Sequence, residues 1–314
     1  MSCRVGTVAV LCLLVSLLAC KALKEEPKGP DYSSLSFEQL PAAPAFEVAG
    51  WAETPPKLDA PRPRLVVAWT TWCPTCTAET PALNALYKKY EGKIDFVALS
   101  DESVGDLVSH VQQRPVSVRR VFPVAADSDV DTMHVYGRAV GEAKVTLPKA
   151  WLVHRGKILW HGSPADVQPA IDEVLTTGDA AVARKARSRI EALGTAYQGA
   201  FAKGGSAGAT AQAEQLLTAA TGYGYTTILL VARLLDAEPK PDAAFAVKLA
   251  KLANDASFNA DYVHLSILAM AQWENGQRAD ARDTQARSVT LCRDLKGECE
   301  DVETQLAEYR KAGE

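Results

Sequence analysis

The sequence has no strong charge of either sign, no long apolar run and no second pair of cysteines at metal-like spacing. Its 314 residues carry a formal net charge of -4, which gives no indication of nucleic-acid binding. The apolar segment 8–19 is too short to span a bilayer comfortably. Cys73 and Cys76 form an isolated Cys-x-x-Cys pair that no His follows directly, which argues against a zinc site and against covalent haem attachment. We therefore expect no metal, no cofactor and no nucleic-acid partner.

The segment from Trp69 to Pro81 carries the clearest chemical signal. It follows a short aliphatic run, Leu65–Ala68, that is typical of a buried strand. The apolar residues after it recur at the spacing of one helix face, at Leu83, Leu86, Tyr87 and Tyr90. Cys73 and Cys76 therefore lie where a strand ends and a helix begins, and Pro81 should kink that helix.

This position favours redox chemistry at the two cysteines. The first turn of a helix has unpaired N–H groups and a partial positive charge, and both stabilise a thiolate at Cys73 and lower its pKa. Cys76 is close enough to close a small disulfide ring after Cys73 has attacked a partner. Pro74 has no N–H, which costs nothing at the first helical position. The alternative, a purely structural disulfide, would be strained in so small a loop and therefore labile.

The residues from Trp72 to Pro81 resemble the active-site segment of membrane-anchored, extracytoplasmic thioredoxin-like proteins of the TlpA/ResA and CcmG (DsbE) type. The resemblance covers residues 45–178 and implies an α/β thioredoxin-like domain. It also implies a thiol–disulfide oxidoreductase that works as a reductase of protein disulfides, in which Cys73 attacks and Cys76 resolves. A membrane thiol transporter would supply the reducing equivalents.

A second segment, Val145–Pro148, supports this resemblance. In thioredoxin-like proteins a cis proline lies opposite the Cys-x-x-Cys, just before a strand, and the backbone before it pairs with an extended substrate. Two apolar runs here flank the turn Arg155–Lys157, which predicts a hairpin after Pro148. The alternative is an ordinary trans proline at the start of an edge strand. The resemblance thus implies a substrate-binding set of Trp72, Pro74, Thr75, Leu147 and Pro148.

The sequence offers one candidate proton acceptor for the cysteines. Thioredoxin itself has a buried acid in the strand before its active site, whereas the aligned position here is Val67. Glu79, three residues after Cys76, matches an acidic position in the ResA-like proteins. A competing interpretation of Glu79 is a solvated residue that favours the start of a helix. His154 and His161 flank the predicted hairpin, and we expect them to be exposed residues rather than ligands.

The N-terminal residues predict export and a lipid anchor. The apolar segment 8–19 ends in Leu17–Cys20, which resembles a bacterial lipobox, in which the cysteine becomes the lipidated first residue of the mature chain. The alternatives are a plain signal peptide and an uncleaved anchor. We expect a signal peptide over 1–19, lipidation of Cys20 and a place in the cell envelope facing the periplasm, with the outer membrane permitted. Residues 20–44 are rich in Lys, Glu, Pro and Ser and predict a flexible tether.

The remainder of the first half predicts alternating strands and helices. We expect an edge strand within 46–51, a strand at 94–99, a helix at 103–113, a strand at 122–125 and a short helix over 129–136 that Gly137 ends. The strand before Cys73, the helix after it and the strand at 94–99 together predict a βαβ unit.

Residues 179–314 are rich in alanine and predict an all-α domain. Seven segments are predicted as helices, at 180–202, 210–220, 225–235, 243–253, 261–274, 278–295 and 300–311. The pair around Gly276 resembles a tetratricopeptide repeat, with small, aromatic, turn and small residues at Ala271, Trp273, Gly276 and Ala281, but one repeat alone is legible. Two roles stay open for this half, a groove for a partner and a helical pack that covers the redox domain.

Cys292 and Cys299 are a second pair in the export compartment that the leader predicts, where disulfides persist. On an unbroken helix their seven-residue separation would place them roughly 10 Å apart, which is beyond disulfide reach. A bridge therefore requires the chain to bend at Gly297. We expect a stapling disulfide, with two free thiols or a relay to Cys73 as the alternatives.

Two other functions compete with a reductase. A peroxiredoxin-like peroxidase would use Cys73 against peroxide, but Cys73 lies in a Cys-x-x-Cys and not in the Pro-x-x-x-Thr-x-x-Cys context of such enzymes. An interaction protein would bind its partner through the helical half and carry a vestigial redox half. The intact pair of Cys73 and Cys76 argues against such decay.

Overall fold

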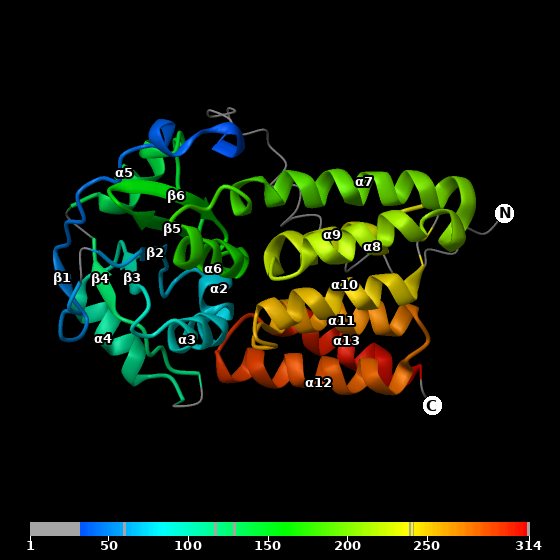
Figure 1. Cartoon of the computed structure of the whole chain (residues 1–314). Coiled ribbons are helices and arrows are strands. Elements are labelled where there is room, and N and C mark those ends of the chain that lie inside the picture. The colour runs from blue at the N-terminus through cyan, green and yellow to red at the C-terminus, as the bar shows by residue number, and fades with distance from the viewer. Residues whose placement is uncertain are drawn as a thin grey trace.

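The computed structural model describes residues 32–58, 61–115, 118–127, 130–238, 240 and 242–312. The expected signal peptide 1–19 and Cys20 lie outside the described residues. A half built on a sheet and a half built of helices lie side by side (Figure 1). None of the helices in the described ranges has the length and apolar character that crossing a membrane requires. The predicted order, an α/β domain followed by an all-α domain, is confirmed.

A six-stranded mixed sheet forms the centre of the first half. Its strands are β1 (Gly50–Trp51), β2 (Arg64–Ala68), β3 (Asp95–Ser100), β4 (Val124–Ala126), β5 (Lys149–His154) and β6 (Lys157–Gly162). They lie in the order β1-β4-β3-β2-β5-β6, in which β2, β3 and β4 are parallel and the other pairings are antiparallel. The central strands β2 and β3 are near-continuous apolar runs because both of their faces are covered.

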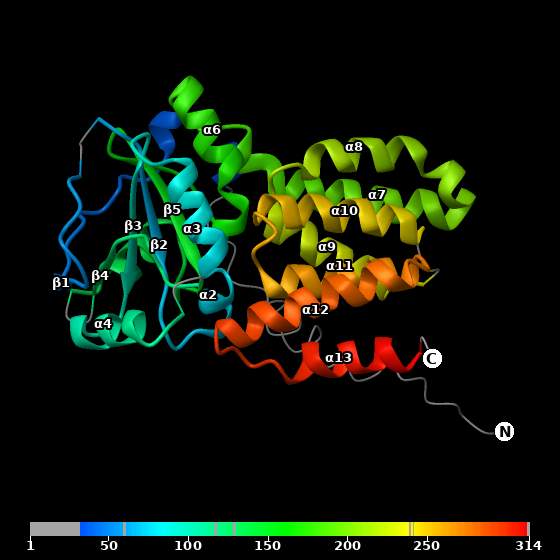
Figure 2. The same ribbon diagram turned by 90° about the horizontal axis from the view of Figure 1, so that it is seen from below.

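Helices cover both faces of this sheet. They are α2 (Pro74–Ala78), α3 (Thr80–Lys89), α4 (Val104–Gln112), α5 (Thr132–Ala139) and α6 (Gln168–Thr177). Successive residues of a strand point to opposite faces. Leu65 and Val67 of β2 therefore join the apolar cluster of α3 and α6, whereas Val66 and Ala68 join the cluster of α5. Figure 2 shows α2, α3 and α6 on the side of the sheet nearer the helical half.

The chain after β2 forms two short helices instead of one. Helix α2 ends at Ala78, Glu79 lies at the junction, and α3 begins at Thr80 with Pro81 in its first turn. Proline lacks an N–H and clashes with the preceding turn of a helix, so it is tolerated near a helix start. The predicted kink at Pro81 is thus confirmed as a break at Glu79.

Seven helices form the second half in the described part of the chain. They are α7 (Ala183–Gly208), α8 (Thr210–Ala220), α9 (Gly224–Leu235), α10 (Ala243–Ala256), α11 (Tyr262–Glu274), α12 (Arg278–Asp294) and α13 (Glu300–Lys311). The predicted segments 210–220 and 300–311 coincide with α8 and α13. Helix α7 is kinked at Gly205, whose φ of 58° favours glycine. Consecutive helices pack together, and the buried faces of α7 to α11 share one apolar core.

The helical half packs against the end of α2. Ala78 of α2 and Val118, from the connection that precedes β4, belong to one apolar cluster with residues of the helical half. The buried members from that half are Tyr262, Val289, Cys292, Leu295, Val302 and Leu306. A polar contact lies nearby, since Gln168 Nε2 donates to the backbone oxygen of Ala256 at 2.5 Å. The end of α2, a helix that begins inside the Cys-x-x-Cys, therefore takes part in the contact between the two halves.

Residues 32–44 pack against the sheet, so the prediction of a flexible tether is wrong for this part of the segment 20–44. Leu40 is 1% exposed and belongs to the core. Tyr32 Oη donates to the backbone oxygen of Ile158 in β6 at 2.9 Å. The composition of this stretch is polar, but a few apolar side chains with a sheet edge to contact suffice to order it.

Helix α5 is displaced from the predicted segment 129–136. The carboxylate of Asp127 accepts hydrogen bonds from the backbone N–H groups of Thr132 at 2.9 Å and Met133 at 2.7 Å, which places the helix start later. The helix also continues through Gly137 instead of ending there. A Cβ at Gly137 would lie 2.6 Å from Val145 Cγ2, so this glycine permits close packing inside the helix.

The predicted hairpin is confirmed as β5 and β6, but the expected exposure is wrong for half-buried His154 and for His161. The side chain of His161 is 19% exposed and its Nδ1 lies 3.3 Å from Glu142 Oε1. The edge strand expected within 46–51 is confirmed only as the two residues of β1, which pair with β4 at the edge of the sheet.

Candidate active site

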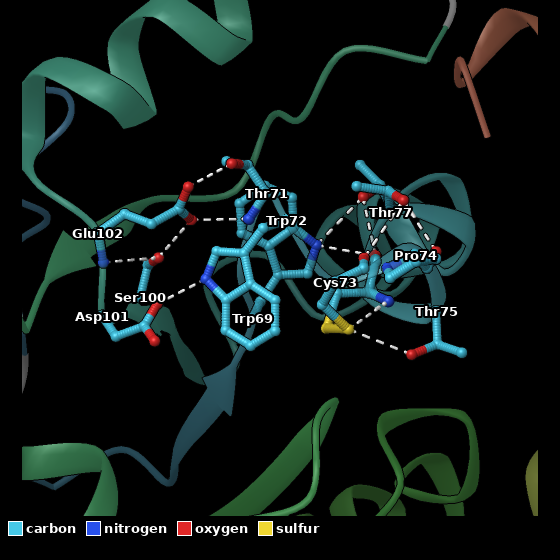
Figure 3. Close-up of a disulfide and its surroundings, with 12 residues drawn as sticks. Trp69, Thr71, Trp72, Cys73, Pro74, Thr75, Thr77, Ser100, Asp101 and Glu102 are labelled. Carbon is cyan, nitrogen blue, oxygen red and sulfur yellow. Dashed lines mark hydrogen bonds between the residues drawn. A yellow bond between two sulfur atoms is a disulfide. The ribbon is translucent and has the colours of Figure 1, made fainter. Parts of the chain in front are cut away.

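Cys73 and Cys76 form a disulfide at the start of α2, with their Cα atoms 5.2 Å apart. Cys73 is the N-cap residue of α2, and its sulfur accepts a hydrogen bond from the backbone N–H of Cys76 at 3.2 Å. The hydroxyl of Thr75 lies 3.2 Å from the same sulfur. The Cys73 sulfur therefore lies where polar hydrogens converge, as Figure 3 shows. These contacts favour a negatively charged sulfur when the disulfide is reduced.

The two sulfurs differ in accessibility. Cys73 is 5% exposed, whereas Cys76 is completely buried. Pro74 and Thr75 lie between them and are at least partly exposed. Cys73 is therefore the sulfur nearer to solvent, and the roles of Cys73 as attacking thiol and Cys76 as resolving thiol stay a prediction.

Trp69 fixes α2 relative to the sheet. Its ring is 1% exposed, and its Nε1 donates to the backbone oxygen of Cys76 at 2.8 Å and lies 3.2 Å from Thr80 Oγ1. Edge-to-face packing against Phe122, at 6.0 Å between ring centroids, holds the indole in place. The active-site helix is thus anchored from the residue that directly follows β2.

Three consecutive residues at the carboxyl end of β3, beginning with its last residue, hold the loop before Cys73. Glu102 accepts hydrogen bonds from the backbone N–H of Thr71 at 2.7 Å and from its hydroxyl, and Ser100 Oγ donates to the same carboxylate at 2.7 Å. Asp101 Oδ1 accepts from Trp72 Nε1 at 3.0 Å, while the indole of Trp72 remains 60% exposed (Figure 3). The apolar face of Trp72 is therefore presented to solvent in a defined orientation beside the disulfide.

Sequence reasoning missed this support from Ser100, Asp101 and Glu102. A signal was present, because these residues are at the carboxyl end of β3, which runs parallel to β2. Side chains that follow neighbouring parallel strands meet at one edge of a sheet. The active-site loop after β2 and the acids after β3 therefore had to lie close together.

The predicted cis proline is present, since the peptide bond between Leu147 and Pro148 is cis. Lys149, the first residue of β5, pairs with Ala68, the last residue of β2. Because these strands are antiparallel, Pro148 and the loop to Cys73 lie at the same end of the sheet. The side chain of Leu147 packs against the apolar clusters on both faces.

Glu79 is buried at the junction of the two halves, and the interpretation of this residue as solvated is wrong. It is 7% exposed, and its Oε2 has no hydrogen-bond partner in the described part of the chain. Burial, assisted by the carboxylates of Asp261 and Asp166, raises the pKa of Glu79 well above its ordinary value. Glu79 therefore carries a proton under conditions in which an exposed glutamate has lost it. Val67, at the position of the acid in thioredoxin, is fully buried in β2.

Cys292 and Cys299 form a second disulfide, with their Cα atoms 5.8 Å apart. The chain bends between α12 and α13, where Lys296 adopts a φ of 52° and the N–H of Gly297 donates to the backbone oxygen of Cys292 at 3.0 Å. The bend at Gly297 that a bridge requires is thus present. The arrangement pairs Cys292 with Cys299 and not with Cys73.

Among the described residues, no group of three or more His, Cys, Asp or Glu side chains is arranged to hold a metal ion. His154 and His161, at opposite ends of the hairpin, are not brought together with any of the cysteines in a ligand set.

Three features define a thioredoxin-like domain. They are the mixed sheet, the Cys-x-x-Cys at the start of the helix after a central strand, and the cis proline before the adjacent antiparallel strand. Residues 41–161 match the model of the AhpC/TSA family. The fold class predicted from the sequence, a thioredoxin-like domain followed by a helical domain, is confirmed.

The chain is similar to proteins named thiol-disulfide oxidoreductase ResA. It is 30% identical to ResA of Bacillus thuringiensis subsp. konkukian over 110 residues, which are 34% of this chain and 58% of that protein. It is 35% identical to ResA of Bacillus anthracis over 94 residues, 29% of this chain and 49% of that protein. The chain thus spans about half the length of the curated relatives it matches. StoA of Bacillus subtilis is a solved structure with 21% identity and a TM-score of 0.28, covering 33% of this chain and 75% of that one.

Proposed function

We propose that this protein is a thiol–disulfide oxidoreductase that reduces protein disulfides through Cys73 and Cys76. The observation that carries the proposal is the position of the Cys73 sulfur at the N-cap of α2, where it accepts the N–H of Cys76. Thiolate stabilisation at this position lowers the thiol pKa and raises the fraction of reactive sulfur at neutral pH.

The reaction proceeds in two exchange steps. The Cys73 thiolate attacks one sulfur of the substrate disulfide, that bond breaks, a mixed disulfide forms, and the other substrate sulfur leaves as a thiolate that takes up a proton. The Cys76 thiolate then attacks the Cys73 sulfur and releases the second substrate sulfur. The cysteine pair is left as the disulfide found in this structure, and two electrons have passed to the substrate.

Glu79 is the candidate proton carrier for the second step. It follows Cys76 by three residues and is buried beside the same helix. Cys76 must lose its proton to become a nucleophile, and a carboxyl group with a raised pKa is better matched to a thiol than an ordinary one. We infer that Glu79, in its ionised form, receives the proton of Cys76 directly or through water.

The substrate is held as an extended strand beside Pro148. In the described part of the chain, no hydrogen bond joins the backbone of residues 143–147 to another backbone group, so Leu147 is available to pair with a peptide. The exposed indole of Trp72, with Pro74 and Thr75, supplies the opposite wall. These groups would contact the backbone and the apolar surface of the substrate. They would therefore accept several protein disulfides and not one particular sequence.

The place of the protein is proposed from its leader. A lipidated Cys20 would hold the chain at a membrane of the cell envelope, facing the periplasm, with the outer membrane as one possible destination. A membrane thiol transporter would then return two electrons to the disulfide of Cys73 and Cys76. The helical half would act as a cover, as the packing of Ala78 against Tyr262 and Leu295 suggests, and a partner groove on that half is the competing role.

The test is turnover of insulin disulfides by the full chain with dithiothreitol as reductant. We expect catalysis above the dithiothreitol background, its loss in Cys73→Ser, and its retention when Cys292 and Cys299 are both replaced by Ser. A wild-type rate equal to that of Cys73→Ser would refute the reductase. The match to the AhpC/TSA family makes a peroxidase the second candidate, and consumption of peroxide that needs Cys73 while insulin is left intact would establish it instead.

A further inference from the structure

The segment between α5 and β5 carries Leu147 and Pro148 but has little regular structure to hold it. In the described part of the chain its residues 143–147 make no hydrogen bond to other backbone groups. Val145 is the one residue of this stretch that is buried, at 6% exposure. A loop of this kind samples many conformations unless side chains fix its two ends.

An ion pair joins the two ends of this loop. Glu142, just after α5, accepts a hydrogen bond from Lys149 Nζ, seven residues along the chain. The side chains are only 12% and 16% exposed, so salt and water screen this pair less than a surface pair. The pair therefore closes the loop directly beside the cis peptide bond.

His161 of β6 lies beside the carboxylate of this pair. Its Nδ1 is 3.3 Å from the Glu142 oxygen that also receives Lys149. The ring of Tyr32, from the N-terminal segment, packs edge-on against His161 at 4.6 Å between centroids.

Lys149 is the main cation that faces Glu142. Burial lowers the pKa of His161, and the positive charges of Lys149 and Arg187 act in the same direction, against the attraction of Glu142. Burial alone would raise the pKa of Glu142, but its contacts with His161 and Lys149 outweigh this and lower it. Glu142 is therefore an anion at neutral pH, and its partner in charge is Lys149.

We propose that Glu142 and Lys149, backed by His161, are positioning residues that hold the backbone of Leu147 and Pro148 in the shape that pairs with the substrate. This inference rests on the proposed function. The two residues act through the loop and not on the sulfurs, since they lie on the sheet face that carries α5, opposite the face that carries the cysteines. Their loss should weaken substrate capture and leave the sulfur chemistry unchanged.

The experiment compares full-chain variants in the insulin assay. Lys149→Met removes the charge and keeps most of the length, Lys149→Arg keeps the charge, and Lys240→Met is a matched control at an exposed ion pair with Glu274 in the helical half. We expect Lys149→Met to raise the KM for insulin by about tenfold. The charge-assisted contact that orders the loop is lost, and binding of the substrate must then supply that free energy. The kcat of this variant and the rate at which iodoacetamide alkylates reduced Cys73 should each stay within about twofold of wild type.

The variants separate a positioning role from a merely structural one. Recovery of the wild-type KM in Lys149→Arg, with no change in Lys240→Met, supports the positioning role. A KM for Lys149→Met equal to that of wild type, or an equal loss of insulin turnover and of Cys73 alkylation, overturns it while leaving the reductase intact. Should Lys149→Met fail to fold by circular dichroism, Glu142→Gln carries the same expectation. A wild-type protein without insulin turnover overturns both proposals.

Discussion

Replacing Glu79 by Gln tests whether this buried carboxyl group keeps a proton in the folded protein. Glu79 is 7% exposed at the junction of α2 and α3, and two further carboxylates, Asp261 and Asp166, act on it. Burial is the main cause that raises the pKa of Glu79 above its ordinary value, and these carboxylates add to it. Glutamine has nearly the same shape as protonated glutamate but cannot ionise, so the change removes the titration and little else.

The sign of the effect follows from proton binding. Between the ordinary pKa of a carboxyl group and the raised pKa in the folded protein, the folded state keeps a proton that the unfolded state has lost. The favourable contribution is therefore complete below the unfolded pKa and is lost as pH rises towards and through the folded pKa. One proton corresponds to about 1.4 kcal/mol of unfolding free energy per pH unit. Above about pH 5, wild type should lose stability relative to Glu79→Gln at up to this slope.

The assay is urea unfolding at pH 5, 6 and 7 for wild type, Glu79→Gln and a control, Glu91→Gln. Glu91 follows α3 and is exposed to solvent, so its replacement should leave the wild-type profile unchanged. The other titratable groups are common to all three proteins and cancel in the difference, apart from the coupling of Asp166 to Glu79, which is part of the effect being measured. If the profiles of wild type and Glu79→Gln run parallel, the pKa of Glu79 is not raised in the folded state, and the argument for its role as proton carrier is wrong.

Three further predictions concern the cysteines. Cys76→Ser should trap mixed disulfides through Cys73, whereas Cys73→Ser should trap few, and equal trapping on non-reducing gels would contradict the assigned roles. Replacement of both Cys292 and Cys299 by Ser should lower the unfolding free energy by roughly 2–3 kcal/mol, since the closed loop is short, and should leave insulin turnover nearly unchanged. Peptide mapping that finds both thiols free in protein from its native compartment would refute this disulfide. Cys20→Ser should abolish lipidation, and a mass spectrum of the wild-type N-terminus with unmodified Cys20 would refute the anchor.

Elements with strong local signals were predictable from the sequence. Helices α8 and α13 lie where the apolar period and the flanking breaks placed them, and the turn Arg155–Lys157 is the hairpin between β5 and β6. The start of α2 at the Cys-x-x-Cys was likewise predictable, because the aliphatic run of β2, Pro74 and the following helix face are all local features. In each case the signal lies within the element itself.

Elements fixed by distant contacts were not predictable. The start of α5 depends on Asp127, which lies outside the helix, and its continuation through Gly137 depends on close packing against Val145. The polar composition of residues 32–44 indicated a tether, but the order of this stretch comes from Leu40 and from Tyr32 against β6. Composition reports the average tendency of a segment and not the partner that covers it.

The candidate site shows the same division. Cys73, Cys76 and Pro148 could be placed because they lie in recognisable motifs. The hydrogen bonds of Glu102 to Thr71, and the burial of Glu79 by the helical half, join residues far apart in sequence. No period or spacing encodes such contacts, and only the parallel pairing of β2 with β3 indicated the first of them.

The central claim is that Cys73 and Cys76 form a reversible two-electron couple that exchanges with other disulfides. The most direct measurement equilibrates the full chain in glutathione buffers of graded potential, blocks free thiols and quantifies the peptide that contains both residues. We expect a single reversible transition of this pair between dithiol and disulfide, while the peptides of Cys292 and Cys299 stay linked throughout. A Cys73–Cys76 pair that stays in one state across the buffers, or that titrates only together with Cys292 and Cys299, would contradict it.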